Sequence, residues 1–175
     1  ARRPDWLPLA SIPLPTVGSF RPPVICLVGF SLMFPACVLR LLDRVAGTCF
    51  FIPAGLVISD RLQPRAGGSP LLWQHMFWFF GHPEVYIAIL PGFGIISHIL
   101  PAVTRKPLLG PRVFIVCMIA IAFLSYTVLG HHMFMSGMNP FSATVFSVPT
   151  LIITIHSAIT TLLWIGPLSG PKPRF

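Results

Sequence analysis

Long apolar stretches, separated by short segments rich in proline, glycine and arginine, dominate this sequence. Four of the stretches reach the length of about 20 mostly apolar residues that crossing a bilayer requires, namely residues 24–42, 71–103, 113–136 and 144–168. The pattern therefore predicts an all-α protein, a polytopic bundle of about four transmembrane helices. We assign residues 1–23 to a separate N-terminal segment rich in proline and arginine, and residues 24–175 to the membrane domain.

The predicted spans differ in regularity. Pro35 interrupts the first. The second is longer than one span requires, so it must tilt, kink or extend into the interface. Pro83 and Pro91 are its candidate kink sites, because proline removes a backbone donor from a helix interior. The connections are a Gly/Pro/Arg-rich loop over residues 43–70, a basic segment over residues 104–112 and a short turn over residues 137–140.

The composition agrees with a membrane location. Of 175 residues, 54% are hydrophobic and only 9% are charged, and the mean hydropathy is +0.82. Soluble domains carry about 25% charged residues. Four acidic residues cannot cover the surface of a soluble protein, so most of the chain must face lipid or other protein. The four cysteines show no CxxC spacing, and we interpret them as small buried hydrophobes. A soluble enzyme, a disordered tail and a secreted disulfide scaffold are excluded.

The net charge of +8 comes from basic residues that lie almost entirely between the apolar stretches. Basic residues in that position anchor the ends of spans, whereas a nucleic-acid surface needs them clustered on one face. We therefore expect contact with a lipid bilayer and no nucleic acid. Eight basic residues fall on the side of both termini and four on the other, so we place both termini in the cytoplasm or matrix. We predict no signal peptide, because a proline-rich stretch follows the early arginines.

Polar and ionisable residues gather at membrane depth, where they are costly and usually functional. His82 and Tyr86 are four residues apart, about 40° around a helix, so they share one face. Glu84 is about 200° from His82, so we expect it to face elsewhere and to suit a proton relay better than a metal ligand. His131 and His132 are adjacent, and one centre can take both only if it lies between their directions.

One histidine from the second span and two from the third predict three imidazoles that converge between helices. Imidazole nitrogen suits copper, zinc or iron, and three ligands leave a position open for substrate. A lone histidine in a membrane is more often a hydrogen-bonded packing residue. We interpret His75, His98 and His156 in that way.

The stretch over residues 71–134, with LLWQHMFWFFGHPEVYIAILPGFGIISH and GHHMFMSGMNP, closely resembles subunit I of the haem–copper terminal oxidases of the cytochrome c oxidase type. HPEVY together with HH is highly specific. LLDRVAGTCFFIPAG over residues 41–55 and the last span also look like that family, and residues 1–37 match it loosely. The resemblance implies a fragment of the twelve-helix subunit I fold, covering about its fifth to eighth spans.

The resemblance also implies residue roles. His82, His131 and His132 would be the three ligands of the copper in the oxygen-reducing centre. Tyr86 would be the tyrosine joined covalently to the first of these histidines, which supplies an electron and a proton when the O–O bond breaks. Glu84 would pass protons toward the centre, and Trp78 would pack near the copper ligands. Thr160 stands where the family has a lysine that feeds protons to the centre, which puts this proton route in doubt.

By the same resemblance, the chain would be part of a respiratory oxidase that reduces O2 to water with proton translocation. Its electrons would come from cytochrome c or quinol, and its partners would be other oxidase subunits, including a copper-carrying electron-entry subunit. It would lie in the bacterial cytoplasmic membrane or the mitochondrial inner membrane. The family's haem ligands belong to spans that have no counterpart here, so this chain would bind copper but neither haem, and we expect it to be inactive alone.

Two alternatives remain at this point. The first is a non-catalytic membrane relic of a decayed oxidase gene, which Thr160 and the proline-rich ends favour. The second is a membrane transporter that handles metal ions or protons through its histidines and Glu84.

Overall fold

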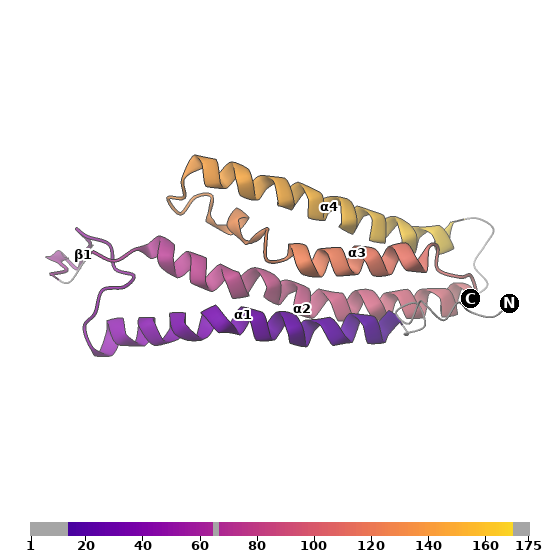
Figure 1. Ribbon diagram of the computed structural model, residues 1–175, viewed down its shortest axis with the longest axis horizontal. Coiled ribbons are helices and arrows are strands. Elements are labelled where there is room, and N and C mark those ends of the chain that lie inside the picture. Colours follow the sequence, from indigo (N-terminus) through magenta and orange to yellow (C-terminus); the bar gives the residue numbers. More distant parts are fainter. Residues whose placement is uncertain (1–13, 65–66, 170–175) are drawn as a thin grey trace.

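The computed structural model of the chain is a bundle of helices with one small hairpin at its end (Figure 1). It describes residues 14–64 and 67–169. The elements of this described part are helices α1 (Leu14–Val45), α2 (Pro70–Thr104), α3 (Pro111–Leu124) and α4 (Pro140–Leu168), the short 3-10 helix η2 (Leu129–Met133), and strands β1 (Val57–Ile58) and β2 (Arg61–Leu62). The prediction of an all-α protein is confirmed, since the fold is 73% helical.

Three of the helices begin at a capping residue followed by proline. The side chain of Ser69 accepts from the backbone N–H of Leu72 before α2, and that of Asn139 accepts from Phe141 before α4. Gly110, in a left-handed conformation, precedes α3. Proline at the first helical position loses no hydrogen bond, because that N–H has no partner inside the helix. The Ser-Pro, Gly-Pro and Asn-Pro pairs therefore set where these helices start.

Three helices are long and apolar enough to cross a membrane: Pro22–Val45 within α1, then α2 and α4. The second and fourth predicted spans match α2 and α4 closely. The first is longer than predicted, because α1 already includes residues 14–23, which the sequence pattern assigned to the N-terminal segment. The rest of that segment, residues 1–13, lies outside the described residues. Despite its internal prolines, α2 is one continuous helix.

The third predicted span differs most. Helix α3 has 14 residues and ends at Leu124, and a turn then leads into η2. The hydroxyls of Ser125 and Thr127 donate to the carbonyls of Ala122 and Leu124, at 2.7 and 2.8 Å. Such local bonds compete with the helical ladder. The apolar pattern continued past residue 124, but the helix did not.

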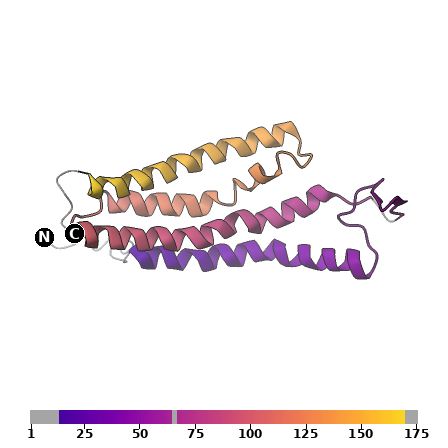
Figure 2. The same ribbon diagram turned by 180° about the vertical axis from the view of Figure 1, so that it is seen from behind.

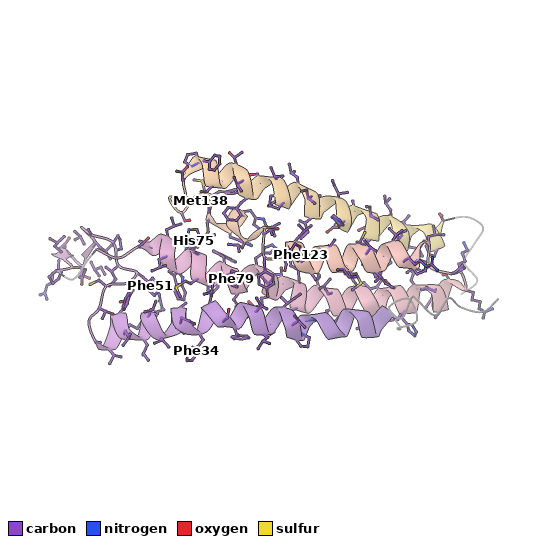
Figure 3. The ribbon with its side chains drawn as sticks, in the orientation of Figure 1. Phe34, Phe51, His75, Phe79, Phe123 and Met138 are labelled. Carbon is purple, nitrogen blue, oxygen red and sulfur yellow. The ribbon has the colours of Figure 1, made fainter. Side chains whose placement is uncertain are left out.

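The helices are arranged in chain order, with α1 beside α2 and α3 beside α4 (Figures 1 and 2). The β1–β2 hairpin extends beyond the end of the bundle where α1 stops and α2 starts (Figure 1). A core runs through all four helices and includes Ile25, Leu90, Phe114, Met118, Ile121 and Ile153. Many outer side chains remain exposed, such as Phe34, which lies on the side of α1 away from α2 (Figure 3). Such apolar outer faces suit lipid or another protein.

A second, smaller core lies beside η2. Leu129, Met133 and Met138 are buried there, packed against the side chains of Trp78 and Phe146 among others. Because η2 has only five residues, this packing rather than its own hydrogen bonds holds it against α2 and α4.

Candidate metal centre

His82 lies in the interior of α2 and is 5% exposed. Tyr86 follows one turn later, and the two rings are 5.1 Å apart between centroids, at an interplanar angle of 56°. The expectation that these side chains share one face of the helix is confirmed. At this distance the ring of Tyr86 is a direct neighbour of the ring of His82.

The other two histidines come from η2 and not from a regular span. Gly130, immediately before them, packs so closely on α4 that a Cβ atom there would lie 2.0 Å from Cγ of Phe146. The absence of a side chain at this position lets η2 approach α4. That approach brings His131 and His132 to the level of His82.

Three ring nitrogens converge at this point. Nδ1 of His82 is 2.9 Å from Nε2 of His132, and Nε2 of His131 is 3.1 Å from the same atom. One nitrogen from each of the three rings can be chosen so that all lie within 4.8 Å of one another. Nitrogens that share one ion at about 2.0–2.1 Å are themselves separated by about 2.9–3.6 Å. The two separations of 2.9 and 3.1 Å therefore match those of nitrogens that share one metal ion.

Thr150 of α4 determines which nitrogen of His131 is available. Its hydroxyl donates to the carbonyl of Phe146 at 2.8 Å, so its oxygen accepts from Nδ1–H of His131 at 3.2 Å. With its proton on Nδ1, His131 presents the lone pair of Nε2 to the cluster. A hydrogen bond to the non-ligating nitrogen is the usual way in which a metal-binding imidazole is oriented.

The donor set fits a metal ion better than it fits hydrogen bonding alone. Nε2 of His132 faces both other nitrogens, and with one proton it can satisfy only one of them. Nε2 of His82 is buried with no hydrogen-bond partner. If His82 carries its proton on that nitrogen, its Nδ1 lone pair points to the cluster as well. An ion would then accept three lone pairs at once, and three imidazoles suit copper, zinc or iron.

An indole ring covers one side of the cluster. Trp78 stacks on His132 with 3.8 Å between ring centroids and an angle of 5°. Its Nε1–H donates to the side-chain oxygen of Gln74 at 2.7 Å. Trp78 therefore lies directly against His132, and its hydrogen bond to Gln74 holds the indole in that orientation.

The remaining candidates lie apart from the cluster. Glu84 is exposed and is absent from the group of metal-capable side chains, as its direction on the helix predicted. His75 and His98 are also exposed, and Nδ1 of His156 donates to the carbonyl of Ile152 at 2.9 Å. Thr160 is fully buried, with its hydroxyl bonded to the carbonyl of Ser157.

Sequence reasoning missed Gln74 and Thr150. Both are polar residues within apolar helices, which is a usable signal, but several other residues share it. Only the contact between elements distinguishes them: Thr150 touches a histidine 19 positions away in the chain.

Comparison with known proteins agrees with the resemblance carried by these motifs. The family described as cytochrome c and quinol oxidase polypeptide I matches residues 2–175. The chain is 45% identical over 163 residues to the alternative cytochrome c oxidase subunit 1 of Bradyrhizobium diazoefficiens, covering 93% of this chain and 27% of that protein. It is 37% identical over 173 residues to cytochrome c oxidase subunit 1 of Alkalihalophilus pseudofirmus, covering 99% of this chain and 26% of that protein. With the Bacillus subtilis protein of the same name it shares 36% identity over 164 residues, covering 94% of this chain and 25% of that protein. The chain thus spans about a quarter of the length of these relatives.

Proposed function

This chain belongs to the cytochrome c and quinol oxidase polypeptide I family, and on that premise we propose that it supplies the copper-binding part of an oxygen-reducing centre. The whole enzyme would be a respiratory haem–copper oxidase that reduces O2 to water and translocates protons. The observation that carries the proposal is the convergence of three imidazole nitrogens, two of them 2.9 and 3.1 Å from the third.

The ligands of the copper ion would be Nδ1 of His82, Nε2 of His131 and Nε2 of His132, the nitrogens that face one another. When bound, copper supplies one-electron redox chemistry to oxygen. Thr150 keeps a proton on Nδ1 of His131 and thereby keeps the opposite nitrogen free to ligate. Trp78 limits rotation of the His132 ring by stacking on it.

Two further side chains would serve proton transfer. Tyr86 lies beside His82 and would deliver the proton of its hydroxyl toward the centre. Its place one helical turn from His82 also makes a covalent link between the two rings reachable. Glu84, on the other side of α2, would bring protons toward the centre from a different direction.

The described residues offer no site for haem, which the family uses beside copper. Three of the six histidines form the cluster. His75 and His98 are exposed, and His156 bonds to its own helix. We propose that residues outside this chain hold it. Electrons would come from cytochrome c or quinol through a copper-carrying partner subunit.

The apolar helices and the family make this an integral membrane protein. The membrane would be a bacterial cytoplasmic or a mitochondrial inner membrane. Thr160, which is buried and bonded to its own helix, would not replace a lysine as a proton carrier, so protons would reach the centre by other residues.

The test is the amount of copper and haem per chain, measured after purification of the tagged protein from its native membranes. We expect copper near one per chain, abolished in His131→Ala and in His132→Ala. His98→Ala is the matched control, because it removes an imidazole outside the cluster, and it should keep its copper. Equal copper loss in all three variants would contradict the ligand assignment. Copper with neither haem nor oxygen uptake would favour metal transport instead.

A further inference from the structure

His75 is an imidazole near the start of α2 that takes no part in the metal centre. It is exposed, and among the residues that the structure describes its ring has no hydrogen-bond partner. His75 and His82 are seven residues apart, which places them about 20° apart around the helix and about 10.5 Å apart along it. His75 therefore lies on the face of α2 that carries the metal centre, two turns nearer to the start of the helix.

A methionine lies at the same end of the bundle as His75 (Figure 3). Leu71 and Trp78 are on the same side of α2 as His75, one turn before and one turn after it. Both pack against the buried group that consists of Leu129, Met133 and Met138. Met133 is fully buried, whereas Met138, in the turn before α4, is 9% exposed and lies at the edge of the group. The packing on either side of His75 therefore brings its ring to the edge where Met138 lies.

The depth of the histidine cluster makes the approach of a metal ion costly. Helix α2 has 35 residues and is about 52 Å long, against about 30 Å for the hydrocarbon core. With the core centred on α2, His82 lies about 7 Å inside the hydrocarbon and His75 about 3.5 Å outside it. An ion loses its water at the depth of His82, so protein ligands must replace that water. His75 and Met138 lie where this replacement would begin.

We propose that His75 and Met138 form an outer copper site, which takes up Cu(I) at this end of the bundle and passes it to the histidine cluster. Thioether sulfur is a soft ligand that selects Cu(I), and imidazole nitrogen also suits copper. Magnesium and calcium prefer oxygen ligands, and zinc binds thiolate, imidazole or carboxylate, so the sulfur of Met138 favours copper among these ions.

Transfer from the outer site is a ligand exchange. The bonds from Cu(I) to the sulfur of Met138 and to a ring nitrogen of His75 break, and bonds to the ring nitrogens of the cluster form. All of these donors are lone pairs of neutral groups, so neither the oxidation state nor the number of protons changes. This inference rests on the proposed function, because the cluster is the destination of the ion.

The experiment follows copper uptake by the tagged chain in membranes from copper-starved native cells. Cu(I) buffered by a chelator is added, and the copper bound per chain is measured at intervals after purification. His75→Leu and Met138→Leu should each fill at least about tenfold more slowly than the wild type, the loss that removal of a supporting contact at a metal site produces. Both should reach the wild-type final content, because the cluster keeps its three ligands and leucine nearly conserves the volume of methionine.

His98→Leu and Met118→Leu are the matched controls. They change an exposed histidine nearer the other end of α2 and a buried methionine of the larger core, and both should fill at the wild-type rate. His75→Met keeps a soft donor and should restore most of the rate. Wild-type rates in His75→Leu and Met138→Leu would overturn the proposal. A normal rate with a lower final content in Met138→Leu would also overturn it, because loss of packing alone has that effect.

The His131→Ala variant separates this inference from the proposed function. It removes a ligand of the cluster but neither donor of the outer site, so titration with Cu(I) should still detect weak binding that a strong chelator reverses. Adding His75→Leu should remove this binding. Binding that persists in the double variant would overturn the outer site and leave the ligand assignment intact. Chelator-resistant copper at the wild-type level in His131→Ala would contradict the cluster itself and, with it, the destination proposed for the ion.

Discussion

Replacing Gly130 by alanine should damage the metal centre without touching any ligand. The new Cβ atom would lie 2.0 Å from Cγ and 2.1 Å from Cδ2 of Phe146. Carbon atoms pack at about 3.5–4.0 Å, so η2, α4 or the ring of Phe146 must shift by about 1.5 Å or more. Gly130 is not among the glycines with positive φ, so the effect is steric and not conformational.

A displacement of that size is large on the scale of metal coordination. Ligand distances tolerate changes of about 0.2 Å, and His131 and His132 would both move relative to His82. Movement would also lengthen the bond between His131 and Thr150, which lie on the two separating elements. Loss of such outer contacts alone weakens metal binding by about tenfold to a hundredfold, and we expect Gly130→Ala to reach at least that loss.

The assay is a titration of copper against a competing chelator in detergent-solubilised protein. Gly92→Ala is the matched control, because a Cβ atom there meets nothing within 4 Å, and its copper affinity should equal that of the wild type. Phe146→Ala removes the ring that Gly130→Ala would strike, so the double variant should recover part of the lost affinity. Wild-type affinity in Gly130→Ala, or no recovery in the double variant, would refute the packing argument.

Three further outcomes follow from individual contacts. Thr150→Val should weaken copper binding about tenfold or more because His131 loses the acceptor of its Nδ1 proton, whereas Thr150→Ser should bind nearly normally; equal affinities by the same titration would contradict this role. Ser97→Ala should lower the free energy of unfolding by about 0.5–1.5 kcal/mol, because Trp164 of α4 donates to the Ser97 hydroxyl of α2 at 2.8 Å. Unfolding in denaturing detergent measures this free energy, and the copper content should not change. Asp43→Ala should speed tryptic cleavage in the loop after α1. The carboxylate of Asp43 accepts hydrogen bonds from a threonine hydroxyl and two backbone amides in that loop, at 2.7, 2.8 and 3.0 Å. An unchanged cleavage rate would show that these bonds do not hold the loop.

Features that depend on neighbours along the chain were predictable. Apolar length identified α2 and α4, because the helical rise and the bilayer thickness together require about 20 residues. The spacing of His82 and Tyr86 placed the two rings side by side, and the position of Glu84 turned it away from them. Helical periodicity is a local rule, so no tertiary information was needed. The family was also predictable, because the HPEVY and HH motifs are local as well.

The end of α3 was not predictable from the apolar pattern. Residues 125–136 continue the composition of a span, but they form a turn and η2. Hydropathy measures only how well a segment tolerates lipid or a protein core. It does not report whether hydroxyls at 125 and 127 bond to carbonyls of the preceding turn. As a result, the histidines predicted at the end of a helix lie on a short element held in place by its packing.

The sequence by itself determined the apolar helices α2 and α4, the points where α2, α3 and α4 begin, and which three histidines could form a centre. Tertiary structure alone decided which nitrogen of each ring faces the others, that Thr150 and Gln74 support them, and that Gly130 permits the approach. The physical reason is the distance between partners along the chain. His82 and His132 are 50 positions apart, and only the packing of α2, η2 and α4 brings their nitrogens to 2.9 Å.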